Sequence, residues 1–262
     1  MNAITFICGF YKNLGMFTEQ QKVWADYPAD LKAQFHAIVT DDCSPKGFRL
    51  GRKAVSDVGI ASIQVYRTLT DVRWNWLFCR NLGVSKALTE WVLLTDVDHV
   101  LPAETLRMLV NETLDPNVVY RPSRIDAPRP WPFALDECAV RENKRYHPNS
   151  WLMTRAMFAK IGGYDERLSG CYGTDGEFRD RVIARAKNVV LLTEPMVRYG
   201  REILPDASTT DFTRKNDPVN DADLVERRQL RALLGDWCPL NLSFPYEHIV
   251  TVRAGQPAEA VA

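Results

Sequence analysis

The order of hydrophobic and polar positions along the chain predicts strands and helices in alternation. Short runs rich in β-branched residues have the length of buried strands, and the longer stretches between them repeat apolar residues at helical spacing. Strands are expected over residues 3–8, 35–40, 60–66, 90–95 and 189–193, and helices over 16–26, 74–88, 103–114, 174–186 and 222–234. Because the two kinds of element alternate, we expect an α/β fold whose mostly parallel central sheet lies between two helical layers.

The stretch from Arg121 to Pro148 breaks this pattern. Prolines interrupt any period there, at positions 122, 128, 130, 132 and 148. A long loop is therefore expected, and both a functional loop and an ordinary surface excursion agree with this composition. The last residues, 254–262, are expected to be frayed.

Composition excludes several classes of protein. The 262 residues are 46% hydrophobic and 25% charged, which suits one large α/β domain or two small ones and excludes a disordered or fibrous chain. Lys and Arg number 33, as do Asp and Glu, so the net charge is zero. This balance argues against a general polyanion binder but leaves room for a local basic groove. The glycine motifs of dinucleotide-binding and P-loop enzymes do not occur.

The cysteines and the hydropathy pattern bear on the compartment. Six cysteines are present without a C-x-x-C pair or a regular spacing, which indicates reduced thiols rather than disulfides or a zinc site. The first residues do not resemble a signal peptide, and no segment approaches the ~18 consecutive apolar residues of a membrane span. A soluble cytoplasmic protein without an integral membrane segment is expected.

The first acidic cluster, Asp41 and Asp42, directly follows the apolar strand at residues 35–40. Ligands of parallel α/β sheets bind beyond the carboxyl ends of the strands, where an aspartate can accept hydrogen bonds from a base or a ribose hydroxyl. The same residues with Ser44 and Pro45 also suit a simple turn.

The second cluster is Asp96-Val97-Asp98, which follows a longer apolar run. A D-x-D triplet alone carries little weight, because Asp221-Ala222-Asp223 is another one in a polar stretch. In an extended chain residues i and i+2 point to the same side, so Asp96 and Asp98 are expected to face one hard cation, Mg²⁺ or Mn²⁺.

The third cluster surrounds Asp175, after the glycine turn at residues 162–163. Thr174 and Glu177 have the spacing of a helix capping box, in which Asp175 would only be a favourable first-turn acid. A carboxylate beside glycines at a helix start is also well placed to meet a substrate.

Together and in this order, the clusters resemble the family 2 glycosyltransferases with the GT-A fold. The family's V-D-D-G-S strand end resembles Thr40-Asp41-Asp42-Cys43-Ser44, and its A-R-N-x-G segment resembles Cys79-Arg80-Asn81-Leu82-Gly83. Its E-Y-V-x-x-x-D-x-D run resembles Glu90-Trp91-Val92 with Asp96-Val97-Asp98. Its G-G-F-D-E and G-E-D-x-E-x-x-x-R segments resemble residues 162–166 and 173–177 with Arg181, so the likeness spans residues 4–192.

The resemblance implies a GT-A, Rossmann-like, three-layer α/β/α catalytic domain over residues 1–200. Its nucleotide-sugar half would cover about residues 1–100 and its acceptor half about 101–200, since the ligand lies where the halves meet. Residues 201–262 would form a C-terminal helical extension and a frayed tail.

The resemblance also implies roles for single residues in moving a sugar from a UDP- or GDP-sugar to a hydroxyl, with inversion. Asp41 or Asp42 would bind the base or ribose, and Arg80 would contact the nucleotide. Asp96 would hold ribose or metal-bound water, and Asp98 would ligate the Mn²⁺ or Mg²⁺ that absorbs charge on the leaving diphosphate. Asp175 would be the general base.

The acceptor is expected to be a saccharide, a glycoconjugate or another hydroxyl compound, with Trp151 lining its cleft. A modified nucleic-acid base stays open as an acceptor. The basic residues that would form a lip for it, which fit a solvated loop equally well, are Arg121, Arg124, Arg129, Arg141, Lys144 and Arg145.

The chain departs from the family's pattern at three places. The first strand lacks the usual proline, and Thr174 stands where a Glu is usual. A late metal-binding His has no counterpart, and Arg198 or Arg201 is a candidate to stabilise the diphosphate instead, although a surface role suits either arginine. His99 and His147 are weak candidates for ligands, because lone histidines occur for many reasons.

Two other functions remain open on the sequence. Asp96 and Asp98 after an apolar strand also resemble the first motif of haloacid-dehalogenase-like phosphohydrolases, as nucleophile and acid/base, although that motif normally opens the chain. A non-catalytic sugar-nucleotide binder is the second alternative, because a fold does not fix a function.

Overall fold

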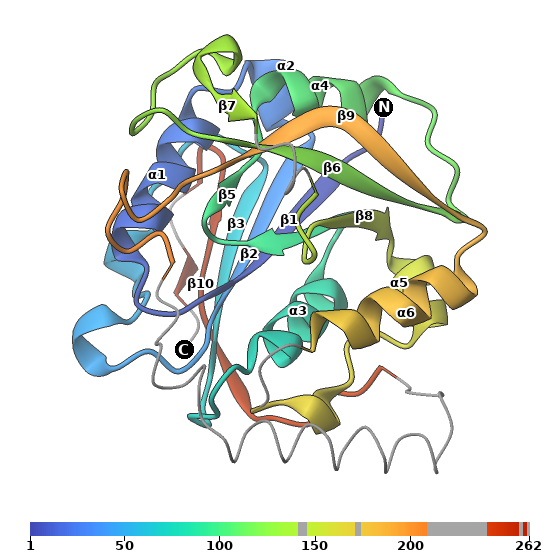
Figure 1. The fold of residues 1–262 in the computed structure, drawn as a ribbon. Coiled ribbons are helices and arrows are strands. Elements are labelled where there is room, and N and C mark those ends of the chain that lie inside the picture. The colour runs from blue at the N-terminus through green and yellow to red at the C-terminus, as the bar shows by residue number, and fades with distance from the viewer. Residues whose placement is uncertain (141–145, 171–173, 209–239, 257–258, 261–262) are drawn as a thin grey trace.

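The computed structural model describes residues 1–140, 146–170, 174–208, 240–256 and 259–260. One sheet runs through them (Figure 1). Its parallel part has the strand order β3-β2-β1-β4, formed by β1 (Ile4–Phe10), β2 (Phe35–Asp41), β3 (Ser62–Thr68) and β4 (Trp91–Asp96). The four strands therefore end at the same edge of the sheet.

Further strands extend the sheet on both sides. Beyond β4 the order continues with β8 (Trp151–Thr154), β6 (Val118–Asp126), β9 (Asn188–Arg198) and β5 (His99–Val100). Beyond β3 lie β10 (Tyr246–Arg253) and β11 (Glu259–Ala260), and β7 (Ala139–Val140) pairs with β6. Of these added pairings only β6 with β9 is parallel. The α/β fold class is confirmed, but the sheet is mixed rather than mostly parallel, with the parallel strands concentrated around β1.

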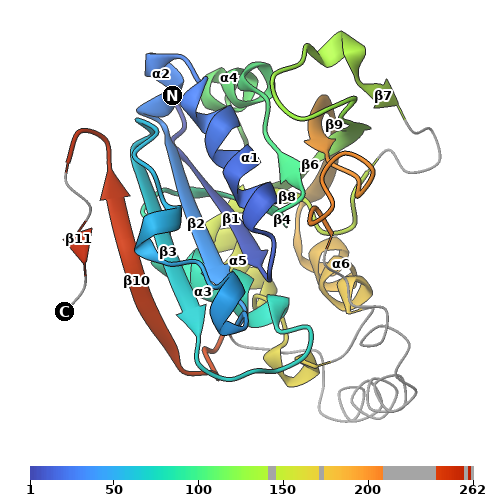
Figure 2. The same cartoon turned by 90° about the vertical axis from the view of Figure 1, so that its left-hand side faces the viewer.

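Helices cover both faces of the sheet (Figures 1 and 2). One face carries α1 (Leu14–Ala25), α2 (Ala29–Lys32) and α4 (Ala103–Asn111), and the other carries α3 (Trp76–Lys86), α5 (Arg155–Ile161) and α6 (Asp175–Arg185). Alternate residues of β1 follow these two layers, because Phe6 and Cys8 belong to one buried core and Ile7 to the other. The predicted three-layer arrangement is thus present.

The two cores fix where α3 lies. Phe6 packs against Trp24 of α1 and Phe35 of β2 at ring separations of 5.8 and 6.1 Å, and each fully buried ring stabilises the fold by about 1.5–3 kcal/mol. On the other face, a Cβ added to Gly83 would lie 2.3 Å from Cγ2 of Ile7. Only glycine allows this close approach of α3 to β1. Near the end of β1, Gly9 lies against Trp76 and Cys79, which places the N-terminal half of α3 at the carboxyl edge of the sheet.

Several predicted boundaries are wrong. The expected loop from Arg121 begins as the second half of β6, and Pro122 is tolerated there because the register of β6 on β9 shifts at that position. The residues expected as an extension and a frayed tail include β10, which pairs with β3 in the central sheet. The predicted helix over 222–234 lies outside the described residues. No helix in the described part of the chain has the length and apolarity needed to cross a membrane.

Candidate active site at the carboxyl edge of the central sheet

The end of β2 carries Asp41 and Asp42, and the two carboxylates are held differently. Asp41 is fully buried, and its oxygens accept hydrogen bonds from the backbone N–H groups of Ser44 (2.8 Å) and Leu50 (3.0 Å). Arg67 Nε lies 3.4 Å from the same carboxylate. Asp41 therefore stabilises the conformation of the loop that follows it. Because backbone N–H groups already occupy its carboxylate oxygens, direct contact of Asp41 with a base or ribose is disfavoured.

Asp42 is largely buried, with 8% of its surface exposed, and links the loop to the next helix. Its side chain accepts a hydrogen bond of 3.2 Å from the backbone N–H of Asn75, the residue before α3. Of the two predicted nucleotide-binding residues at this strand end, Asp42 is the better placed to meet a ligand.

Arg80 lies fully buried on α3, between two aromatic rings. Its guanidinium is 4.4 Å from the ring centre of Trp76 and 5.5 Å from that of Tyr164. It donates to the hydroxyl of Tyr164 (3.1 Å) and to the carboxylate of Asp96. A buried charge is tolerated when it is paired in this way. The sequence-predicted pair of Arg80 and Asp96 is thus brought together.

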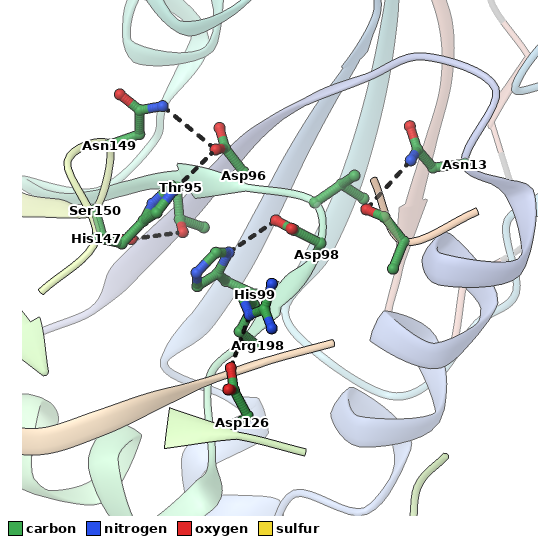
Figure 3. A network of polar contacts seen from close by, with 12 residues as sticks. Asn13, Thr95, Asp96, Asp98, His99, Asp126, His147, Asn149, Ser150 and Arg198 are labelled. Atoms are coloured by element: carbon green, nitrogen blue, oxygen red, sulfur yellow. Dashed lines mark hydrogen bonds and ion pairs between the residues drawn. The ribbon is translucent and has the colours of Figure 1, made fainter. Parts of the chain in front are cut away.

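Asp96 is contacted by polar side chains from two other segments, α3 and the loop before β8 (Figure 3). Besides Arg80, Nδ2 of Asn149 donates to its Oδ2 at 3.3 Å, and Nε2 of His147 lies 3.4 Å from the same atom. Burial alone would raise the pKa of Asp96, but the Arg80 guanidinium holds it below its ordinary value. Asp96 is therefore an anion in the folded protein at neutral pH.

Asp98 lies beyond a turn, and this overturns one expectation. β4 ends at Asp96, and Val97 and Asp98 form a turn, so the chain is not extended through both aspartates. Oδ1 of Asp98 is 2.8 Å from Nδ1 of His99. The side chain of Asp98 keeps 15% of its surface exposed. The two carboxylates thus have separate partners rather than one common face.

His99 and His147 lie together between the two aspartates (Figure 3). Their ring centres are 4.2 Å apart, and Nδ1 of His147 lies 3.3 Å from Oγ of Ser150. Burial and the neighbouring His99 ring hold the pKa of His147 well below its ordinary value, so this ring is neutral. The sequence alone gave little weight to these histidines, whereas the structure connects one to each aspartate.

Asp175 opens α6 at the same place. Burial, and next the negative charge of Asp96, raise the pKa of Asp175 above its ordinary value. The Asn149 amide acts in the opposite direction and lowers the pKa of Asp175, and the same amide donates to Asp96. The predicted capping box does not form, because the Thr174 side chain makes no capping hydrogen bond. A carboxylate with a raised pKa at a ligand-binding edge has the properties of a general base.

Asn81 explains why two of the sequence motifs occur together. Its amide oxygen accepts a hydrogen bond from the backbone N–H of Tyr164, and its amide nitrogen donates to the carbonyl of Tyr164, both at 2.8 Å. The same nitrogen donates to Glu166 at 2.7 Å. This fork fixes Tyr164 over Arg80, which lies one residue before Asn81.

Trp151 does not lie where an acceptor could stack on it. It belongs to β8, is 2% exposed, and packs against Phe178 and under the guanidinium of Arg121, 4.5 Å from the ring centre. The expectation that it lines the acceptor cleft is therefore wrong, because an indole in an apolar run fills the core.

The other basic candidates have protein partners, although Arg198 lies beside His99 and Asp98 (Figure 3). Nε of Arg198 bonds Asp126 at 2.7 Å, and Arg201 bonds the carbonyl of Ser208. Arg124 is buried, and Arg129 pairs with Glu137. Arg141, Lys144 and Arg145 lie outside the described residues. The described arginines thus do not form the expected basic lip.

Sequence reasoning missed Asn149 and Tyr164, which contact Asp96 and Arg80. Tyr164 was read only as part of a motif, and Asn149 carries no local signal because its partners are distant in sequence. Among the described residues, no three or more His, Cys, Asp or Glu side chains are grouped to hold a metal ion.

Comparison with known proteins identifies the family. No curated protein sequence matches the chain significantly. The family model described as Glycosyl transferase family 2 matches residues 22–160, which is more than half of the chain.

Solved structures share the fold at low sequence identity. The mannosyltransferase PcManGT from Pyrobaculum calidifontis, in complex with GDP-Man and Mn²⁺, has a TM-score of 0.51 and 16% identity over 75% of this chain and 56% of its own. TarS 1–349 from S. aureus, with UDP-GlcNAc, gives 0.55 and 18% over 80% and 62%. GalNAc-T7, with UDP, GalNAc and Mn²⁺, gives 0.56 and 13% over 76% and 44%. The chain thus matches between about two fifths and three fifths of their lengths, and it is a member of glycosyl transferase family 2 with the GT-A fold.

Proposed function

We propose that this protein transfers a sugar from a UDP- or GDP-sugar to a hydroxyl acceptor, with inversion and with Mn²⁺ or Mg²⁺. The observation that carries the proposal is the group at the end of β4, where the Asp96 carboxylate, bonded to Arg80 and Asn149, lies near enough to Asp175 for its charge to raise the pKa of Asp175. Complexes of similar folds with GDP-Man or UDP-GlcNAc support a nucleotide-sugar donor.

The donor would lie between the ends of β2 and β4. Asp42 offers a carboxylate to the base or ribose, while Asp41 keeps the loop of this site in shape. Arg80 holds Asp96 in one orientation, and its charge favours a nucleotide diphosphate nearby. The division into a nucleotide half and an acceptor half at about residue 100 agrees with this placement, since the two halves meet at β4.

Asp98 is the proposed main ligand of the divalent cation, and Asp96 is the proposed second ligand. The described residues offer no closed protein cage. A Mg²⁺-type ion does not need such a cage, because one or two carboxylates, substrate phosphates and water can hold it. The partly exposed Asp98 fits an ion of this kind. When bound, the ion supplies positive charge against the leaving diphosphate. Asp96 is committed to Arg80 and Asn149, which makes it the lesser ligand.

Asp175 is the proposed general base. Its raised pKa makes the carboxylate a better proton acceptor for a hydroxyl than an exposed aspartate is. Asn149 donates to Asp96, and the charge of Asp96 is one cause of the raised pKa of Asp175, so the proposed base lies close to the proposed donor site. A hydroxyl deprotonated at Asp175 would attack the anomeric carbon from the face opposite the diphosphate, and one such displacement inverts that centre.

The test is a donor panel with the wild-type protein and two variants. Thermal stabilisation by UDP, GDP and their sugars in the presence of Mn²⁺ identifies the nucleotide, and mass analysis of acceptor mixtures shows transfer. Asp175→Asn should bind the donor normally and lose transfer, whereas Asp98→Ala should lose the metal-dependent part of donor binding. Phosphate release from simple phosphomonoesters, or donor binding by wild type without transfer to any acceptor, would contradict the proposal.

A further inference from the structure

The connection between β2 and β3 forms a basic tip that the candidate active site does not use. Residues 43–56 include Lys46, Arg49, Arg52 and Lys53 and contain no Asp or Glu. All four cations are exposed, and Phe48 between them keeps 48% of its surface exposed. In a chain of zero net charge, this is a local concentration of positive charge around one aromatic ring.

Hydrogen bonds and a buried side chain hold the tip in a defined conformation. Leu50 is fully buried, and its N–H and C=O groups bind Asp41 (3.0 Å) and Nη2 of Arg67 (2.7 Å). Nε of Arg49 donates to the carbonyl of Ser44 at 3.0 Å. These anchors hold two short 3-10 turns, η1 (Lys46–Phe48) and η2 (Arg52–Ala54), in a defined orientation. An ordered tip loses little conformational entropy when it binds.

Three of the four cations of the tip are not neutralised by ion pairs with the described residues. Within the described residues, Lys46, Arg49 and Lys53 form no ion pair. Figure 1 shows the segment extending from the body of the molecule at the lower left, and in Figure 2 it faces the viewer in front of β2 and β3. A projecting tip contacts a flat surface well, whereas a linear polyanion is bound in a groove that covers it on several sides.

We propose that this tip, with Lys46, Phe48 and Lys53 at its surface, docks the protein on an anionic lipid bilayer. The cations would lie among the phosphate groups, and the Phe48 ring would enter the interface below them. Because the tip starts at the carboxyl end of β2, the bilayer would lie beside the sheet edge that carries Asp96 and Asp175. This proposal goes beyond sugar transfer and does not depend on it.

The test is co-sedimentation of the full chain with vesicles, without donor or acceptor. Vesicles of phosphatidylcholine alone are compared with vesicles of equal parts phosphatidylcholine and phosphatidylglycerol, at low and high salt. The protein should sediment only with the anionic vesicles, and added salt should weaken the binding. Sedimentation with neither kind of vesicle overturns the proposal.

Matched variants locate the surface. Lys46→Gln with Lys53→Gln should weaken binding about 30-fold, at about fivefold for each cation near the bilayer. Arg155→Gln with Lys160→Gln removes two exposed charges from α5 and should change binding less than twofold, given that Debye screening limits their reach to about 10 Å. Equal losses in the two double variants would overturn the assignment to the tip.

Phe48→Ser separates the apolar contribution from the charges. The variant should weaken vesicle binding by a similar factor at low and high salt, because burial of the ring is not screened. Thermal unfolding of each variant checks that the fold is kept. A single-stranded oligonucleotide serves as the rival ligand. If the protein bound the oligonucleotide but no vesicles, and if this binding were lost in the Lys46→Gln, Lys53→Gln variant, the ligand of the tip would be a polyanion and not a bilayer.

Discussion

Two acidic pairs at strand ends, Asp41-Asp42 after β2 and Asp96-Val97-Asp98 at the end of β4, look alike in the sequence but are held in different ways. The Asp41 carboxylate is bound by backbone N–H groups of its own loop. The Asp96 carboxylate is bound by the side chains of Arg80, His147 and Asn149, which come from distant segments. A carboxylate bound by local backbone shapes one loop, whereas one bound by distant side chains concentrates charged groups at one place.

The largest expected effect is at the second pair. Asp96→Asn removes the anion that neutralises the buried Arg80 and orients it, so we expect kcat/KM for sugar transfer to fall ~100- to 1000-fold, equivalent to about 3–4 kcal/mol. Steady-state kinetics with the donor varied would measure this loss. Turnover within threefold of wild type would show that the two pairs do not differ in function.

The matching change at the first pair should act on stability instead. Asp41→Asn replaces an oxygen that accepts from Ser44 or Leu50 by an amide donor, which should lower the free energy of unfolding by about 2 kcal/mol. Urea unfolding measures this loss, and kcat of the folded protein should be unchanged. A large fall in kcat with unaltered stability would instead place Asp41 in contact with the substrate.

Asn149 tests whether the link between Asp96 and Asp175 matters for turnover. Asn149→Ala removes the amide that donates to Asp96 and affects the pKa of Asp175. We expect kcat to fall about tenfold, the value of roughly one hydrogen bond to a charged group, with KM for the donor little changed. Asn241→Ala, an exposed amide elsewhere, is the control. A rise in KM with constant kcat would mean that Asn149 binds the donor.

The smallest expected effect is on pH dependence. Burial and the charge of Asp96 raise the pKa of Asp175, and the base acts only when deprotonated, so activity should fall as pH decreases through a value above the ordinary 3.8. In Asp96→Asn one of the charges that raise this pKa is gone, and the acid limb should move to lower pH. Rate profiles of both proteins would show the shift, and an upward movement would remove Asp96 as a cause.

The sequence predicted what local patterns determine. Runs of β-branched residues indicated β1 to β4, and the position of Asp41, Asp96 and Asp175 next to strand and helix ends followed from that pattern. The partners of Asp96 could not be predicted, because they approach it only through the packing of separate segments. The same reason hid β10, since pairing with β3 unites residues more than 170 positions apart.

The turn after β4 was also beyond prediction. An apolar run followed by D-x-D is compatible with a strand that continues through both aspartates and with a strand that ends at the first. The contacts of His99 and His147 with the two carboxylates distinguish these two possibilities, and they are visible only in the structure. Trp151 shows the reverse error, in which a residue type common in sugar sites was read without its burial.

The hydrogen-bond fork of Asn81 has a consequence for exchanging parts between relatives. Its amide grips both backbone groups of Tyr164 and the carboxylate of Glu166, so a segment from the first hundred residues sets the position of one from the second. Consider a chimera that takes its acceptor-binding portion from another member of the family. It will keep the Tyr164 ring over Arg80 only if that other member also has an asparagine at the position of Asn81. Chimeras of this fold should therefore be stable when the asparagine and the segment that it binds are taken from the same parent.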